Sequence, residues 1–157
     1  MENNLKVRIN NGNIKVDGIP MGGVPSVSLP ACITCNPEAP CFQLGYARRV
    51  SARHKRMADG HENNLKVLRA DPATYWAQVR EAVSAVPFFR FHVSGDIPDA
   101  EYMTELARTA EMFPGTVVLV FTKQYSFVNG FVDAGGVIPG NLHIIFRLWD
   151  AEWHANI

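Results

Sequence analysis

Four segments of the chain have the continuous apolar character of strands buried in a sheet. The clearest are Val117–Phe121 and the stretch that begins at Leu142, where β-branched and aromatic residues follow one another. Phe88–Val93 and the shorter Val24–Leu29 have the same character. Such runs are typical of parallel strands whose two faces are both covered. The pattern therefore predicts four central, mostly parallel strands near residues 24–29, 88–93, 117–121 and 142–148.

Amphipathic helices are predicted between these strands. The clearest spans residues 71–86, because Asp71 suits the N-cap, a proline suits the first turn, and valines recur at helical spacing. A second helix is expected over residues 97–113. A third is expected from about residue 42 to residue 57, with Asp59-Gly60 as its break.

Alternation of helices with buried strands predicts an α/β fold built from parallel βαβ units. We expect an open, mostly parallel, three-layer-like sheet, or a partial (β/α) barrel. Residues 1–18 are expected to form an N-terminal β-hairpin around an Asn-Asn-Gly-Asn turn. The length of 157 residues is that of one domain. The Gly-rich segment 124–141 is about the minimum for a crossover, so it is the weakest joint of this topology.

Composition excludes several classes of protein. Hydrophobic residues make up 47% and charged residues 19%, which is a globular composition, and the formal net charge is zero. The sequence has no apolar run long enough to span a membrane, and its polar start does not resemble a secretory signal, so the cytoplasm is expected.

Residues 1–70 hold ten basic and five acidic side chains, and the excess of basic side chains lies in Arg48–Arg69. This stretch is favoured as a solvated helix face, with an anion or nucleic-acid site as the alternative.

Polar groups follow the carboxyl end of every predicted strand, which is where parallel sheets place their chemistry. In a parallel sheet these groups converge on one edge. The site prediction therefore comprises Cys32, Cys35, Cys41, Ser94, Gly95, Asp96, Lys123 and Arg147. A small zwitterionic ligand would complement it, because Asp96 accepts from an ammonium while Lys123 or Arg147 donates to a carboxylate.

The three cysteines have the spacing C-x2-C-x5-C in a loop that contains two prolines. Thiolates are soft ligands for zinc or iron, so a shared metal is expected. Zinc would need a fourth ligand from His54, His61 or His92, whereas a [4Fe–4S] cluster held by three thiolates keeps one iron open. Reduced thiols without metal remain the alternative. For His92, a hydrogen-bonded core role is favoured over ligation, and the other two histidines are expected to be exposed.

Three stretches together resemble the phage gene-product-88-like family, which is related to radical S-adenosylmethionine (SAM) enzymes. They are PSVSLPACITCNPEAPCFQLGYARR, then FRFHVSGDIPDAEYMTELARTAEMFPG, then VFTK. The resemblance implies cluster ligation by Cys35 and Cys41, an approach of Gly95 and Asp96 to the SAM amino group, and a match of Lys123 to the family's Thr-Lys.

Two features depart from that family pattern. Gly45 stands where a cluster cysteine is expected, and a further cysteine-containing segment after the end of this sequence is absent. The expected function is thus a metal- or cluster-binding phage protein of radical-SAM-like fold that also binds SAM, either active or degenerate. The alternatives are a zinc-binding module, or a metal-free protein that binds a partner or nucleic acid through Arg48–Arg69. An exposed edge strand starting at Leu142 predicts a homo-oligomer.

Overall fold

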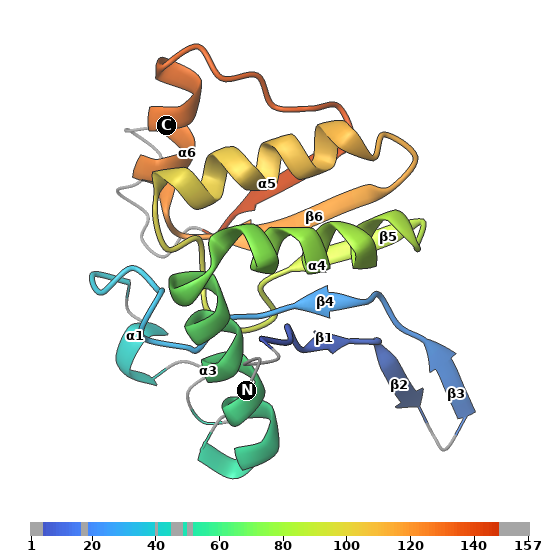
Figure 1. Ribbon diagram of the computed structural model, residues 1–157. Helices are drawn as coiled ribbons and strands as arrows, with labels where there is room; N and C mark the ends of the chain where they lie inside the picture. The colour runs from blue at the N-terminus through green and yellow to red at the C-terminus, as the bar shows by residue number, and fades with distance from the viewer. Residues whose placement is uncertain (1–4, 17–18, 40, 45–48, 50–51, 148–157) are drawn as a thin grey trace.

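The structure is a computed structural model, and it describes residues 5–16, 19–39, 41–44, 49 and 52–147. Among these residues, four strands and three helices come first along the chain, and from residue 72 onward helices and strands alternate, as Figure 1 shows. The strands are β1 (Ile9–Asn10), β2 (Asn13–Val16), β3 (Ile19–Gly22), β4 (Ser26–Val27), β5 (Phe88–Phe91), β6 (Val117–Thr122) and β7 (Leu142–Phe146). The helices are α1 (Cys41–Leu44), α3 (Lys55–Ala70), α4 (Pro72–Ser84), α5 (Ala100–Met112) and α6 (Tyr125–Asp133).

Five strands form an open sheet in the order β1-β4-β5-β6-β7. The four strands from β4 to β7 are parallel, and β1 runs antiparallel to β4. The predicted α/β class and mostly parallel open sheet are therefore confirmed. The joint between β6 and β7 is a true crossover, because it contains α6. As predicted, β7 is an edge strand; self-association through it stays a prediction.

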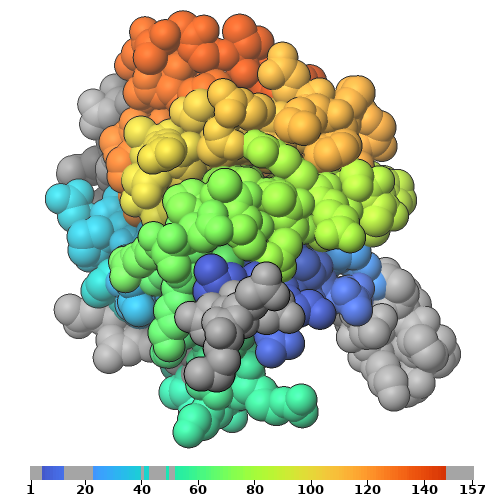
Figure 2. Space-filling view, in the orientation of Figure 1, coloured from blue at the N-terminus to red at the C-terminus, as the bar shows by residue number. Residues whose placement is uncertain are grey.

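One face of the sheet carries the core. Val27, Phe89, Phe91, Val118 and Val120 are fully buried there, and they belong to one cluster with buried residues of α3, α4, α5 and α6. Figure 2 shows the side chains of these helices as a continuous layer on the viewer's side. On β5, β6 and β7 the opposite face keeps exposed or half-buried residues, so the described part of the chain forms two layers where three were expected.

An N-terminal hairpin is present, but the sequence placed it wrongly. Its strands are β2 and β3, which pair antiparallel from Asn13 opposite Gly22 to Val16 opposite Ile19. β1 does not pair with β2 across the Asn-rich turn, because it joins the main sheet beside β4. Gly12 allows the redirection, since its φ of +69° is accessible to glycine at little energetic cost.

The expected break at Asp59-Gly60 is also wrong, because α3 runs through both residues. A glycine within a helix costs about 1 kcal/mol relative to alanine, and tertiary contacts offset that amount. Leu65 and Val67 join the core, and the buried Asn64 side chain donates to Ser28 O and accepts from the Arg8 amide.

Helices α4 and α5 each begin at an aspartate that caps the helix. Asp71 caps α4, accepting from the Thr74 amide at 2.9 Å, as predicted. α5 is capped by Asp99, which accepts from the Tyr102 amide.

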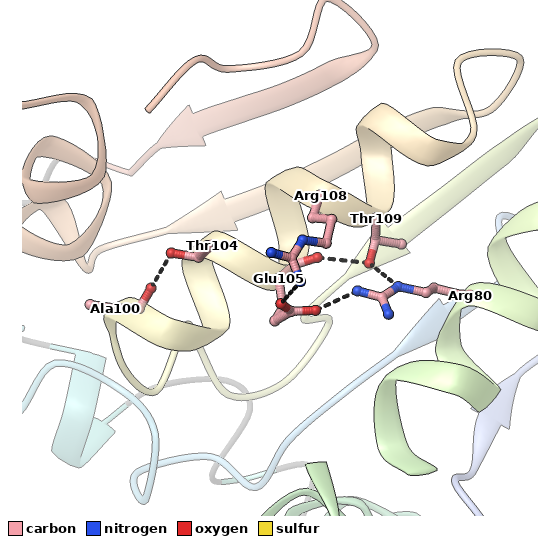
Figure 3. Close-up of polar contacts among 6 residues, drawn as sticks. All are labelled: Arg80, Ala100, Thr104, Glu105, Arg108 and Thr109. Carbon is pink, nitrogen blue, oxygen red and sulfur yellow. Dashed lines mark hydrogen bonds and ion pairs between the residues drawn. The ribbon is translucent and has the colours of Figure 1, made fainter. Parts of the chain in front are cut away.

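α4 and α5 are joined by a polar cluster that Figure 3 shows in detail. The Arg80 guanidinium forms an ion pair with Glu105 and donates to Thr109 Oγ1 at 3.2 Å. Arg108, one turn further along α5, donates to the other oxygen of Glu105 at 2.8 Å.

None of the described helices is long and apolar enough to cross a membrane.

Candidate functional site at the carboxyl edge of the sheet

A cavity of about 160 Å³ lies at the carboxyl ends of β4, β5 and β6. Its wall includes every residue of the predicted site: Cys32, Cys35, Cys41, Ser94, Gly95, Asp96, Lys123 and Arg147. The convergence follows from the parallel topology, because these groups come directly after neighbouring strands. Their common location is thus established, whereas their ligands remain predictions.

The turn that follows β5 is backbone-strained at the cavity. His92 has a φ of +62° and Gly95 a φ of +77°, both in the left-handed region. The turn is held to the segment after β4, where Leu29 N donates to Ser94 O and Ser28 Oγ accepts from the Val93 and Ser94 amides. Left-handed backbone in a residue other than glycine is uncommon and concentrates at functional sites.

Thr34, between Cys32 and Cys35, fastens the cysteine loop to this turn. Its hydroxyl accepts from the Asp96 amide at 3.0 Å, and its carbonyl accepts from the Gln124 side chain. The fit is close, because a Cβ on Gly95 would lie 2.7 Å from Thr34 Oγ1 and 2.6 Å from Leu29 O. Only glycine fits here, which explains the Ser-Gly-Asp sequence in physical terms.

The Asp96 carboxylate joins the ends of β5 and β6. One oxygen accepts from Thr122 Oγ1 at 2.6 Å and from the Ile97 amide, and the other accepts from the Lys123 amide at 2.9 Å. Burial raises the pKa of this carboxyl, and the three hydrogen bonds oppose that rise. Asp96 is therefore a positioning group whose oxygens also line the cavity.

The cysteine loop holds its three thiols in different environments. Cys32, with a φ of +68°, donates from Sγ to Phe42 O at 3.0 Å, and Cys41 is exposed. Burial, with smaller contributions from the nearby Asp96, Cys32 and Cys41, raises the pKa of Cys35 to about 11, against the lowering effect of a hydrogen bond from the Cys32 backbone. Cys35 is thus a neutral thiol at neutral pH, close enough to the other two to interact with them.

These thiols are chemically suited to a soft metal, but their arrangement is not. Within the described residues, no three histidine, cysteine, aspartate or glutamate side chains form a group placed to hold a metal ion. Thiolate ligands must be deprotonated and must lie within about 2.3 Å of a zinc ion. The loop would have to close around an ion before it could bind it.

Three cations face the cavity. Lys123 and Arg147 were predicted, and Arg90 on β5 was not. The guanidinium carbons of Arg90 and Arg147 lie 4.9 and 5.8 Å from the centre of the Phe121 ring. Burial lowers the pKa of Arg90, and the neighbouring charge of Arg147 lowers it further. An anion at this position would relieve that repulsion.

Two buried polar side chains on the cavity wall lack partners among the described residues. Both ring nitrogens of His92 and the hydroxyl of Ser94 make no hydrogen bond to any described residue, although these residues are only 3% and 5% exposed. His92 is therefore buried as predicted, but the described part of the chain gives its ring no hydrogen bond. Burial lowers its pKa to about 3, with Arg90 and His61 as smaller causes, so its ring is neutral. The His92 ring packs 5.4 Å from the Tyr102 ring, so a ligand or water in the cavity reaches these polar atoms only if the wall rearranges.

The basic stretch lies away from this cavity. Arg49, Arg53 and Arg56 are exposed, as a solvated surface requires, while Arg48 lies outside the described residues. His54 is exposed as predicted, but His61 is half-buried, and burial lowers its pKa. Within the described part, the stretch does not join the site.

The comparisons assign the chain to a family. The sequence profile described as Gene product 88 (GP88) matches residues 2–154. The chain belongs to the GP88 family. Searches of curated proteins and of solved structures found no match to it. The resemblance to phage gene product 88 is thereby confirmed, and the relation to radical SAM enzymes stays a prediction.

Proposed function

We propose that this GP88-family protein binds a small zwitterionic ligand in the cavity at the carboxyl edge, with SAM as the leading candidate. The observation that carries the proposal is the position of the Asp96 carboxylate on one cavity wall with three cations, Lys123, Arg90 and Arg147. Among the described residues, the buried side chains of His92 and Ser94 on the same wall also lack hydrogen-bond partners. A folded protein seldom leaves such groups unsatisfied unless a ligand or water completes them.

The charges of the wall suit the two ends of an amino acid. Lys123 and Arg147 can donate to a carboxylate, and the Asp96 oxygens with the Ser94 hydroxyl can accept from an ammonium. A volume of about 160 Å³ equals roughly five water molecules at about 30 Å³ each. The cavity therefore takes the amino-acid end of a ligand such as SAM, and the remainder would lie outside.

A radical-SAM-like protein that also carries a [4Fe–4S] cluster is the finer form of this proposal, with structural zinc as the alternative. Support comes from the position of Cys32, Cys35 and Cys41 on the wall of the same cavity. Their described arrangement does not fit a metal, so closure of the loop and loss of the Cys35 proton must accompany binding. An iron–sulfur cluster would supply the electron for reductive chemistry when bound.

Calorimetry tests the ligand directly, with SAM and methylthioadenosine as the matched pair. Methylthioadenosine lacks the amino-acid end, so we expect it to bind at least about tenfold more weakly. Asp96→Asn should weaken SAM binding, while Asp99→Asn, which keeps a competent N-cap away from the cavity, should leave it unchanged. Equal affinity for both compounds, or no binding of SAM, contradicts the proposal.

Anaerobic reconstitution with iron and sulfide tests the metal separately. A broad visible absorption with about four irons per chain supports the cluster, one bound zinc supports the alternative, and Cys35→Ala should abolish either. Absence of metal after reconstitution excludes the cluster and leaves the ligand site standing.

A further inference from the structure

The sheet has an open face beside the cavity. Residues in register share a face, so Arg90 and Leu119 lie together with His143, and Phe121 lies with Ile145. Phe88 at the amino end of this face is 53% exposed, and Ile145 is 41% exposed. Parallel sheets are almost always covered on both faces, so an apolar face left open by the described residues calls for an occupant.

The carboxyl end of this open face is cationic. The guanidinium groups of Arg90 and Arg147 both lie over the Phe121 ring, at 4.9 and 5.8 Å from its centre. The ion pairs of the described residues involve only Glu105, so neither of these arginines has an acidic partner there. The half-buried Arg90 also keeps its Nε without a hydrogen bond. Two guanidinium groups at one ring form a fork for a carboxylate or phosphate.

The rest of the face is apolar and large enough for a ligand. A hollow of about 860 Å³ has Phe88, Val117, Leu119 and Ile145 of this face in its wall, and it also extends to α6, where Val128 and Asp133 line it. Arg90 and Arg147 lie outside this wall. That volume is within the range of about 300–1,000 Å³ typical of small-molecule sites. The cationic fork thus stands at one end of an apolar surface.

We infer that the open sheet face binds an amphipathic anion, whose carboxylate or phosphate lies between Arg90 and Arg147 and whose apolar body lies over Leu119 and Ile145. The inference goes beyond the proposed function, because the apolar body of this ligand lies on the sheet face and its binding needs neither the cysteines nor an ammonium group. The two sites share Arg147, which also lines the cavity. Charge complementarity selects the occupant. A second copy packed through the same face would bring two cationic patches into one interface without counter-charge.

Calorimetry with octanoate, octyl phosphate and 1-octanol separates the contribution of the anionic head from that of the chain. We expect at least one of the two anions to bind about tenfold or more tightly than the alcohol, and the tighter one identifies the head group. Arg90→Gln and Arg147→Gln should each remove most of that difference. Arg53→Gln, an exposed arginine on the basic stretch, is the matched control and should change nothing.

A competition experiment with the natural protein gives a second readout, which does not depend on any variant being folded. Inorganic phosphate should compete with the tighter anion but not with 1-octanol, because it occupies only the fork. Leu119→Asn should weaken the acid and the alcohol together. Equal binding of anions and alcohol overturns the inference, and so does failure of all three to bind. In that last case light scattering distinguishes closure of the face by a second copy from closure by the chain itself.

Discussion

The hydroxyl of Thr122 donates to the Asp96 carboxylate at 2.6 Å, and this bond joins the turn after β5 to the end of β6. Both residues are buried, so loss of one partner leaves the other with an unmet hydrogen-bonding need. We expect Thr122→Val to lower the free energy of unfolding by about 1–3 kcal/mol. Urea denaturation of the natural protein and the variant measures this difference in free energy.

Thr104→Val is the matched control for this prediction. Thr104 is exposed on α5, and its hydroxyl bonds only to Ala100 O in its own helix. We expect a change of less than about 0.5 kcal/mol there. A similar loss of unfolding free energy in both variants would show that the bond to Asp96 stabilises the protein no more than the bond within α5.

Three glycine-to-alanine variants separate the effect of steric crowding on stability from the effect of a left-handed backbone conformation. Gly95→Ala meets both, because φ is +77° and the added Cβ would lie 2.6 Å from Leu29 O. Gly135→Ala meets only the left-handed φ of +86°, and Gly115→Ala meets neither. We expect the free energy of unfolding to fall by about 1–2 kcal/mol for Gly135→Ala, by more than that for Gly95→Ala, and hardly at all for Gly115→Ala. Thermal unfolding of the three variants measures these differences. A Gly95→Ala protein as stable as Gly115→Ala would contradict the described turn.

The neutral His92 predicts a specific pH dependence of stability. Burial holds its pKa at about 3 in the folded protein, against the ordinary histidine value of 6.5, so between these two pH values the unfolded state binds the extra proton. The contribution of the neutral His92 to the free energy of unfolding is therefore fully present above pH 6.5. It is lost as the pH falls, by about 2 kcal/mol between pH 7 and pH 5. Chemical denaturation at the two pH values measures this loss.

His92→Asn provides the comparison, because asparagine tolerates a left-handed φ and has no proton to gain. Its stability should change less between the two pH values than that of the natural protein. The raised pKa of Asp96 acts in the opposite direction in both proteins and cancels in the difference. Identical pH profiles would mean that the His92 ring reaches solvent.

Arg80 and Arg108 contact the same acid from different environments. The Arg80 side chain is 22% exposed and bridges α4 to α5, while Arg108 is 59% exposed and lies on the same helix as Glu105. We expect Arg80→Met to cost about 1–2 kcal/mol and Arg108→Met less than about 0.5 kcal/mol. Thermal unfolding at low and high salt checks the ranking, and the reverse order would refute it.

The central strands could be predicted because their signal is local and strong. Val117–Phe121 and Leu142–Phe146 are continuous apolar runs, and the order of helices and strands then made a parallel sheet the simplest arrangement. Hairpin pairing and the passage of α3 through Gly60 could not be predicted in this way. Both are decided by contacts with distant residues, namely β4 for β1 and Ser28 for Asn64.

The site was predictable in its location and not in its detail. Parallel strand ends identify Ser94, Asp96 and Lys123, but nothing local shows that Thr34 fastens the cysteine loop or that Arg90 reaches Phe121. One signal for Arg90 was available. A charged residue that alternates with buried phenylalanines in a strand indicates a sheet face that is not covered.

The central claim is that the carboxyl-edge cavity binds a ligand, and amide NMR of the metal-free protein during a SAM titration tests it most directly. The account predicts saturable shifts of the Ser94, Gly95, Asp96 and Lys123 amide signals with one common dissociation constant. Those shifts should weaken in Asp96→Asn. No shift at these amides, or shifts confined to the exposed arginines of the basic stretch, would contradict it.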